Sequence, residues 1–200
     1  MIRRLSNKIL LYLLKNNAID NDEKQQAFYS YSIEITISSM LNIFIILMLS
    51  VITHSFVLGI TFLLTFIPIR QFTGGYHAKT YFRCNSTFAI CYILTLIICK
   101  TTYSCPMVVS TILFIAELLF VISSCPIANA NKPIDSIKQY QKLKTISISL
   151  YLIYWIIGMY LFKYQDIKLG YMIICTLYTI TVLGIVTKFM KGEKNNEEVQ

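Results

Sequence analysis

Charged side chains are scarce in this sequence. Only 14% of its 200 residues are Asp, Glu, Lys or Arg, whereas 56% are hydrophobic, and the mean hydropathy is +0.59. A soluble domain of this length would not tolerate so much apolar surface. The composition therefore predicts an all-α, polytopic integral membrane protein that forms a single membrane domain over residues 1–200.

Motifs of several other protein classes are missing. The sequence has two histidines, no CxxC or HxxxH spacing and no cysteine pattern typical of disulfides, so we expect neither a metal nor a cofactor. The net charge of +8 comes without a motif for DNA or RNA, so it favours anionic membrane lipids and not nucleic acid as partner. The acidic motifs of a lipid-modifying enzyme that uses a metal and a diphosphate are also absent.

Six apolar runs follow an amphipathic start. The first 19 residues alternate apolar and basic side chains in a pattern that predicts a helix lying on the membrane surface. The runs cover residues 35–52, 56–69, 88–99, 107–123, 146–162 and 169–186, which predicts about six transmembrane helices. The second and third runs are short, so a tilted, re-entrant or internally packed arrangement stays open for them. Pro68 is expected to kink or end the second helix.

The charges between the runs predict the orientation. If all six runs cross the membrane, 15 of the 18 Lys and Arg residues lie on one side and 3 on the other. The basic side faces the cytoplasm, so both termini are expected there. Residues 70–85 and 124–145 would then be cytoplasmic loops, and residues 188–200 a mobile tail. A re-entrant hairpin of the second and third runs is the alternative, and it would bury the cations of the 70–85 loop at considerable cost.

The 70–85 loop contains a thiol and an imidazole. Cys84 follows His77 by seven residues, and the pair could provide a nucleophile and its base. On one straight helix they would lie about 10.5 Å apart along the axis, too far for a hydrogen bond. The backbone must therefore bend, and residues 85–87 are expected to cap a new helix with Cys84 at its N-terminus, where the dipole and Arg83 favour a thiolate. The alternative is that both are ordinary interface residues.

Two further features are candidates for function. The 124–145 segment is basic, and Lys132, Lys138 and Lys142 could dock an acidic peptide by salt-dependent attraction. The alternative is a solvated loop that only sets the orientation. Glu34, at the mouth of the first run, could orient the histidine or neutralise Arg70, or it could reach headgroup water.

The sequence around the thiol resembles the accessory gene regulator B (AgrB) family. Arg70, the string GGYHA at 74–78 and Cys84 match the family pattern, and residues 125–134 resemble its proline-and-lysine loop. Length and hydrophobic profile match along nearly the whole chain. The resemblance implies a cysteine endopeptidase of the bacterial cytoplasmic membrane that processes an AgrD-like quorum-sensing propeptide, and it suggests a homodimer.

The resemblance also implies roles for individual residues. Cys84 would be the nucleophile and His77 its base, and cleavage at the C-terminal side of the signal region would leave a thioester on Cys84. A cysteine of the peptide could then attack this thioester and close a thiolactone ring, favoured by the exclusion of water at the membrane surface.

The supporting residues are less well defined by the pattern. Arg70 belongs to the matching string, and Gly74 and Gly75 could bring backbone amides close to an oxyanion. No third member of a catalytic triad is evident, and Gln71 and Glu34 are the alternatives. The rival hypothesis is a small-peptide exporter or membrane scaffold without covalent chemistry, for which a polar path through the bundle would be required.

Overall fold

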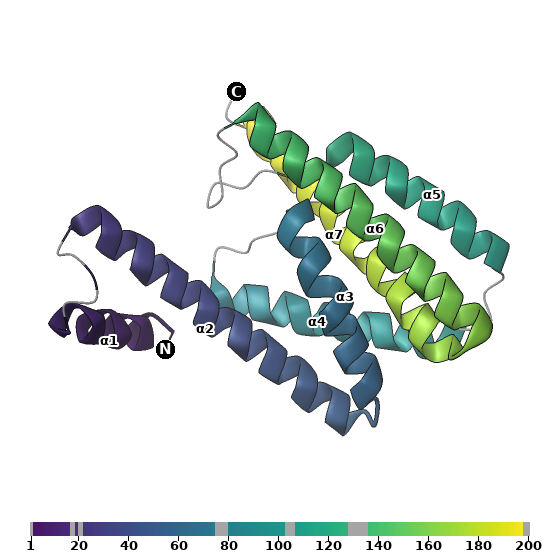
Figure 1. Ribbon diagram of the computed structural model, residues 1–200, viewed down its shortest axis with the longest axis horizontal. Helices are drawn as coiled ribbons and strands as arrows, with labels where there is room; N and C mark the ends of the chain where they lie inside the picture. The colour runs from purple at the N-terminus through teal and green to yellow at the C-terminus, as the bar shows by residue number, and fades with distance from the viewer. Residues whose placement is uncertain are drawn as a thin grey trace.

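The fold is a bundle of long helices in a computed structural model that describes residues 2–16, 19, 22–74, 80–102, 107–127 and 136–197 (Figure 1). Each of the six predicted apolar runs lies within one of its helices, so the predicted all-helical class is confirmed. The described residues form α1 (Ile2–Lys15), α2 (Glu23–Ile52), α3 (Phe56–Thr73), α4 (Tyr81–Thr102), α5 (Met107–Ser124), α6 (Ile137–Tyr164) and α7 (Ile167–Glu197).

Five of these helices, α2, α3, α4, α6 and α7, are long and apolar enough to cross a membrane, and α5 offers a shorter apolar stretch over residues 108–124. Large apolar side chains cover their outer faces, with Phe44, Leu64 and Leu119 each more than half exposed. A lipid environment is the solvent that such a surface requires. The chain is a multi-pass membrane protein.

α3 lies at the centre of the arrangement and contacts α2, α6 and α7. Its buried face is aromatic: the rings of Phe62 and Phe66 stack with centroids 5.0 Å apart, and both contact Phe88 of α4. α1 lies apart from this core, beside the N-terminal half of α2 (Figure 1). The buried Ser6 hydroxyl of α1 donates to the Ser30 carbonyl of α2 at 3.1 Å, which fixes the amphipathic helix at that place.

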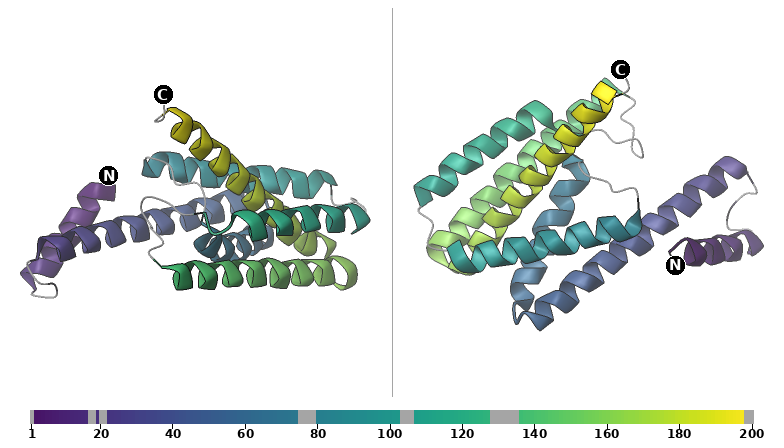
Figure 2. Two further views of the ribbon diagram at one scale, coloured as in Figure 1. Left: turned by 90° about the horizontal axis from the view of Figure 1, so that it is seen from above. Right: turned by 180° about the vertical axis from the view of Figure 1, so that it is seen from behind.

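α5, α6 and α7 run side by side on the opposite side of the molecule (Figure 2). α6 and α7 approach closely because Gly170 has no side chain: a Cβ there would lie 2.4 Å from the carbonyl oxygen of Gly158. Residues 170–177 of α7 are consecutively buried. Among the five helices long enough to cross a membrane, α7 is therefore the most enclosed.

Pro68 was expected to kink or end the second helix, and the second of these alternatives is wrong. α3 does not end there but continues to Thr73. Proline has no N–H to donate to the carbonyl one turn before it, which here belongs to Leu64. The Tyr154 hydroxyl of α6 donates to that carbonyl at 2.7 Å. A neighbouring helix thus supplies the missing donor, which allows the proline inside a membrane helix.

The segment expected to be a basic loop over residues 124–145 is also shorter than predicted. α6 begins at Ile137, because the Ser136 side chain accepts a hydrogen bond from the Gln139 amide at 3.1 Å and caps the helix. Lys138 and Lys142 are therefore exposed on a helix. At the C-terminal end, α7 extends helically to Glu197, into the stretch expected to be a mobile tail.

The proline compensation generates a prediction. Tyr154→Phe should lower the free energy of unfolding by about 1–3 kcal/mol, because the Leu64 carbonyl loses its donor in an apolar setting. Thermal unfolding in detergent or lipid measures this, with Tyr160→Phe, an exposed tyrosine of the same helix, as the control. In a Pro68→Ala background, where an N–H is restored, Tyr154→Phe should cost less, and equal costs in both backgrounds would contradict the explanation.

Candidate functional site

Cys84 lies in the first turn of α4, as the sequence predicted, but the cap differs from the predicted one. The helix begins at Tyr81, and the Thr80 hydroxyl accepts a hydrogen bond from the Arg83 amide at 3.3 Å. The expectation that residues 85–87 start the helix is wrong, since these residues continue it. A threonine directly before the helix was a detectable capping signal. The dipole of α4 is positive at this end, and Cys84 lies within that first turn.

His77 and Gly75 lie outside the described residues. α4 begins after His77, so the thiol and the imidazole do not share that helix. The predicted pairing of Cys84 with His77 therefore stays a prediction.

Cys84 differs from the other described cysteines in its exposure. It is half-buried, whereas Cys91, Cys99, Cys125 and Cys175 are buried. Burial raises the pKa of the Cys125 thiol to about 11, so this cysteine is protonated at neutral pH and a poor nucleophile. The exposed fraction thus selects Cys84 as the accessible thiol among these five.

Arg70 lies in the last turn of α3 and faces α4. Its guanidinium lies 5.5 Å from the centroid of the Phe66 ring and is close enough to Cys84 and Cys91 to interact electrostatically with both. Positive charge beside a thiol stabilises its thiolate form. The predicted supporting residue is therefore within electrostatic range of the predicted nucleophile, while Gln71, one residue further along α3, is exposed.

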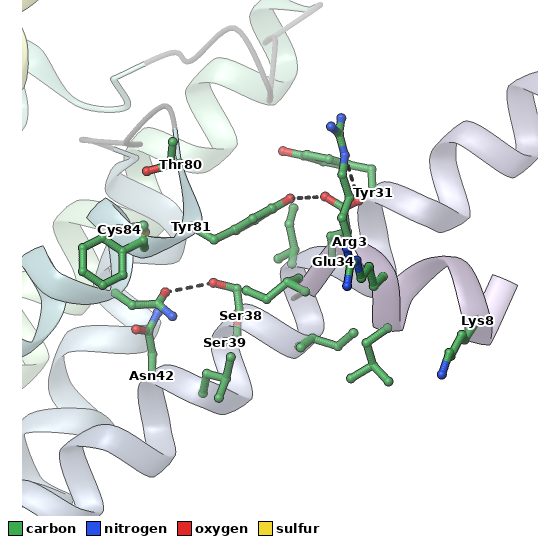
Figure 3. Close-up of a pocket in the computed structure, with 18 residues that line it drawn as sticks. Arg3, Lys8, Tyr31, Glu34, Ser38, Ser39, Asn42, Thr80, Tyr81 and Cys84 are labelled. Atoms are coloured by element: carbon green, nitrogen blue, oxygen red, sulfur yellow. Dashed lines mark hydrogen bonds and ion pairs between the residues drawn. The ribbon is translucent and has the colours of Figure 1, made fainter.

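An open cavity of about 1110 Å³ lies in front of Cys84. Its walls come from three helices: α1 contributes Arg3 and Lys8, α2 contributes Glu34 and Ser38, and the start of α4 contributes the thiol (Figure 3). Most of its remaining lining is apolar. Cys84 therefore lies at the wall of a space that is large enough for a peptide segment.

Glu34 connects all three walls of this cavity. Only 8% of it is exposed, and its carboxylate accepts a hydrogen bond of 2.7 Å from the Tyr81 hydroxyl and lies 3.8 Å from the Arg3 guanidinium (Figure 3). The described contacts thus link Glu34 to Tyr81 and Arg3, and none of them links it to Arg70. Because Arg3 is largely exposed, the hydrogen bond to Tyr81 is the stronger of the two contacts.

A second hydrogen bond between α2 and α4 reinforces the one between Glu34 and Tyr81. The Ser38 hydroxyl donates to the Asn85 side chain at 3.0 Å. Glu34 and Ser38 are one turn apart on α2, as Tyr81 and Asn85 are on α4, so two successive turns of each helix meet in register. Cys84 lies between the two α4 residues, and its turn is held on both sides.

The ends of α3 and α5 meet near the same region. Gly74 has a φ of +72°, and a Cβ on it would lie 2.4 Å from the Ile127 carbonyl oxygen, so only glycine fits. The Ile127 amide donates to the Thr73 carbonyl at 2.9 Å. The start of the 124–145 segment therefore lies against the end of the helix that carries Arg70.

Comparison with known proteins decides the family. Residues 6–187 match the family described as Accessory gene regulator B. The chain belongs to the AgrB family. An AgrB-like protein of Clostridium beijerinckii is 28% identical over 98% of this chain and 96% of its own length. One of Clostridium perfringens (strain SM101 / Type A) is 26% identical over 92% of this chain and 88% of its own length. No solved structure matches.

AgrB membership confirms the family resemblance of the sequence and assigns the chain to quorum-sensing peptide processing in the accessory gene regulator system, in association with an AgrD-like propeptide. In this AgrB protein Lys138 and Lys142 are on α6 and do not line the Cys84 cavity, and Lys132 lies outside the described residues. No group of three or more potential metal ligands occurs among the residues that were resolved well enough to describe.

The contact between α2 and α4 generates a prediction. Tyr81→Phe removes one hydroxyl, so Glu34 loses its hydrogen bond. The unfolding free energy should then fall by about 1 kcal/mol, the typical net contribution of one hydrogen bond at a partly hydrated site. Arg3→Ala should change it by less, about 0–0.5 kcal/mol, because that ion pair is long and exposed. Thermal unfolding measures both. A larger loss in Arg3→Ala than in Tyr81→Phe would contradict the ranking, and Tyr12→Phe on the exposed face of α1 is the control.

Proposed function

We propose that this AgrB protein is a membrane cysteine endopeptidase that cleaves an AgrD-like propeptide at the C-terminal side of its signal region, with Cys84 as nucleophile. The observation that carries the proposal is the half-buried Cys84 in the first turn of α4, which lines a cavity and lies within electrostatic range of Arg70. The four other described cysteines are buried, which supports the choice of this thiol.

The proposed reaction proceeds in two steps, cleavage with formation of a thioester and then ring closure. His77 takes the thiol proton, the sulfur of Cys84 attacks the scissile carbonyl carbon, and the C–N bond breaks as the proton passes to the leaving amine. The signal region is then held as a thioester. A cysteine thiolate of the peptide attacks that carbonyl, a new C–S bond forms, and Cys84 leaves as thiolate, which gives a thiolactone.

The arrangement of the cavity supports this sequence of steps. Apolar side chains of α1 and α2, among them Leu5 and Ile35, line part of it, and exclusion of water by these side chains and by the bound peptide would favour ring closure over hydrolysis of the thioester. The contacts of Glu34 and Ser38 with α4 hold the turn that carries the nucleophile, which is the preorganisation that covalent catalysis requires. Gly74 and Gly75 remain candidates for presenting amides to the oxyanion.

Orientation completes the proposal. The excess of Lys and Arg on one side of the predicted topology favours a cytoplasmic position for both termini in the bacterial cytoplasmic membrane. The 70–85 segment and the propeptide would then meet at the inner face. The alternative hypothesis, a peptide exporter or membrane scaffold, differs from the peptidase proposal in needing no reactive thiol, and this difference can be measured.

The nucleophile is tested by co-expression with the AgrD-like propeptide. Cys84→Ala and His77→Ala should give no processed product while the protein stays in the membrane, and mass spectrometry of the peptide measures this. Cys91→Ala is the matched control, because Cys91 is on the same helix face near Arg70 but buried. Processing that persists in Cys84→Ala would remove the peptidase and favour the exporter.

The docking lysines are tested separately. Neutralising Lys138 and Lys142 to Gln, alone and with Lys132, should weaken propeptide binding at low salt and leave the rate at saturating propeptide unchanged, since long-range attraction acts on encounter. Binding measured in vesicles over a salt series checks this. Lys163→Gln at the far end of α6 is the control, and unchanged binding at low salt would rule out docking by these lysines.

A further inference from the structure

Glu117 is a carboxyl group at mid-height in the apolar helix α5, and the proposed peptidase chemistry does not use it. The side chain is 6% exposed, and its Oε2 atom has no hydrogen-bond partner. No lysine or arginine forms an ion pair with it in the described part of the chain. A carboxylate in such a place is costly unless it is paired, whereas a neutral carboxyl group is far less so.

The surroundings of Glu117 come from the two helices against which α5 packs. Tyr151 of α6 and Tyr178 of α7 lie close enough to interact with it electrostatically, and both are neutral groups. Their hydroxyls have partners of their own: Tyr151 bonds with Thr181 at 3.2 Å, and Tyr178 donates to the Ser110 carbonyl at 3.2 Å. These contacts leave Glu117 without a counter-charge in a setting of aromatic rings.

The contacts that attach α5 are found on either side of this carboxyl group. One turn before it, the Phe114 ring stacks on Trp155 of α6 at 4.5 Å. At the end of α5, Lys188 of α7 donates to the Ser124 hydroxyl at 3.1 Å. Ser124 is seven residues from Glu117, about 10.5 Å along the helix, so a lysine bonded to Ser124 is not in ion-pair contact with Glu117. α5 thus packs on α6 and α7 with an unpaired carboxyl group in its contact face.

We propose that Glu117 is an intramembrane proton-binding site, at which the neutral acid allows α5 to pack on α6 and α7 and the ionised form loosens that contact. Loss of the proton would place a charge between Tyr151 and Tyr178 with no cation within reach, and separation of α5 would give the charge access to water. The site is independent of Cys84, which lies on the first turn of α4 at the α1–α2 cavity.

The first measurement compares the wild type with Glu117→Gln, a neutral side chain of the same shape, over about pH 6 to pH 10, above the ordinary range of carboxyl groups. The full chain is unfolded thermally in lipid at each pH. Because the folded state holds a proton that the unfolded state releases, the wild type should lose stability relative to Glu117→Gln as pH rises. The tyrosines and cysteines near the site are present in both proteins, so the effect of their titration cancels in the difference between the two stabilities. A pH-independent difference would overturn the proposal.

The second measurement is chemical. Dicyclohexylcarbodiimide reacts with protonated carboxyl groups in apolar surroundings, so it should label Glu117 near neutral pH, with loss of label at high pH and in Glu117→Gln. Glu34, which is hydrogen-bonded at the cavity, is the internal control and should stay unlabelled. Equal labelling of the wild type and Glu117→Gln would overturn the assignment.

Discussion

Lipid offers no hydrogen bonds, and this constraint explains most of the polar contacts in the bundle. A helix that crosses a membrane must satisfy its polar groups from within the protein. Hydroxyls of Thr61, Thr65 and Thr176 do so locally, by donating to carbonyls one turn before them. Other hydroxyls bridge helices, as Thr95 of α4 does with Thr179 of α7 at 2.7 Å. The proline in α3 creates the hardest case, and Tyr154 of another helix resolves it.

The same constraint shapes the candidate site. Cys84 is placed where α4 begins, and a helix start has free amides that need partners. Thr80 caps that start from within the chain, and α2 secures the turn through side chains of the next residues. Three polar contacts thus hold the turn of α4 that carries Cys84. The cavity beside it is left open because α1 contacts α2 and leaves the α4 side uncovered.

The helices of this protein could be predicted from the sequence, whereas the contacts between them could not. Long apolar runs leave no alternative to membrane helices, so all six predicted runs lie within α2 to α7. Cys84 at a helix N-terminus was predicted, although Thr80 and not residues 85–87 provides the cap. The partners of Glu34 were missed because Tyr81 is 47 residues away, and nothing local in the sequence indicates which helix faces α2. The Tyr154 contact was missed for the same reason.

The lack of hydrogen-bond partners in lipid also applies to Glu117. The charge count that predicted the topology used Lys and Arg, and a single acidic residue in the run 107–123 did not alter it. In a bundle where Glu34 receives both a hydroxyl and a guanidinium, a second buried glutamate without either is an exception that needs a physical reason. Neutrality supplies that reason, since an uncharged carboxyl group can remain among aromatic rings at modest cost. The two glutamates would then differ in their surroundings: Glu34 has a hydroxyl and a guanidinium as partners at the edge of the bundle, and Glu117 would stay neutral within it because it has neither.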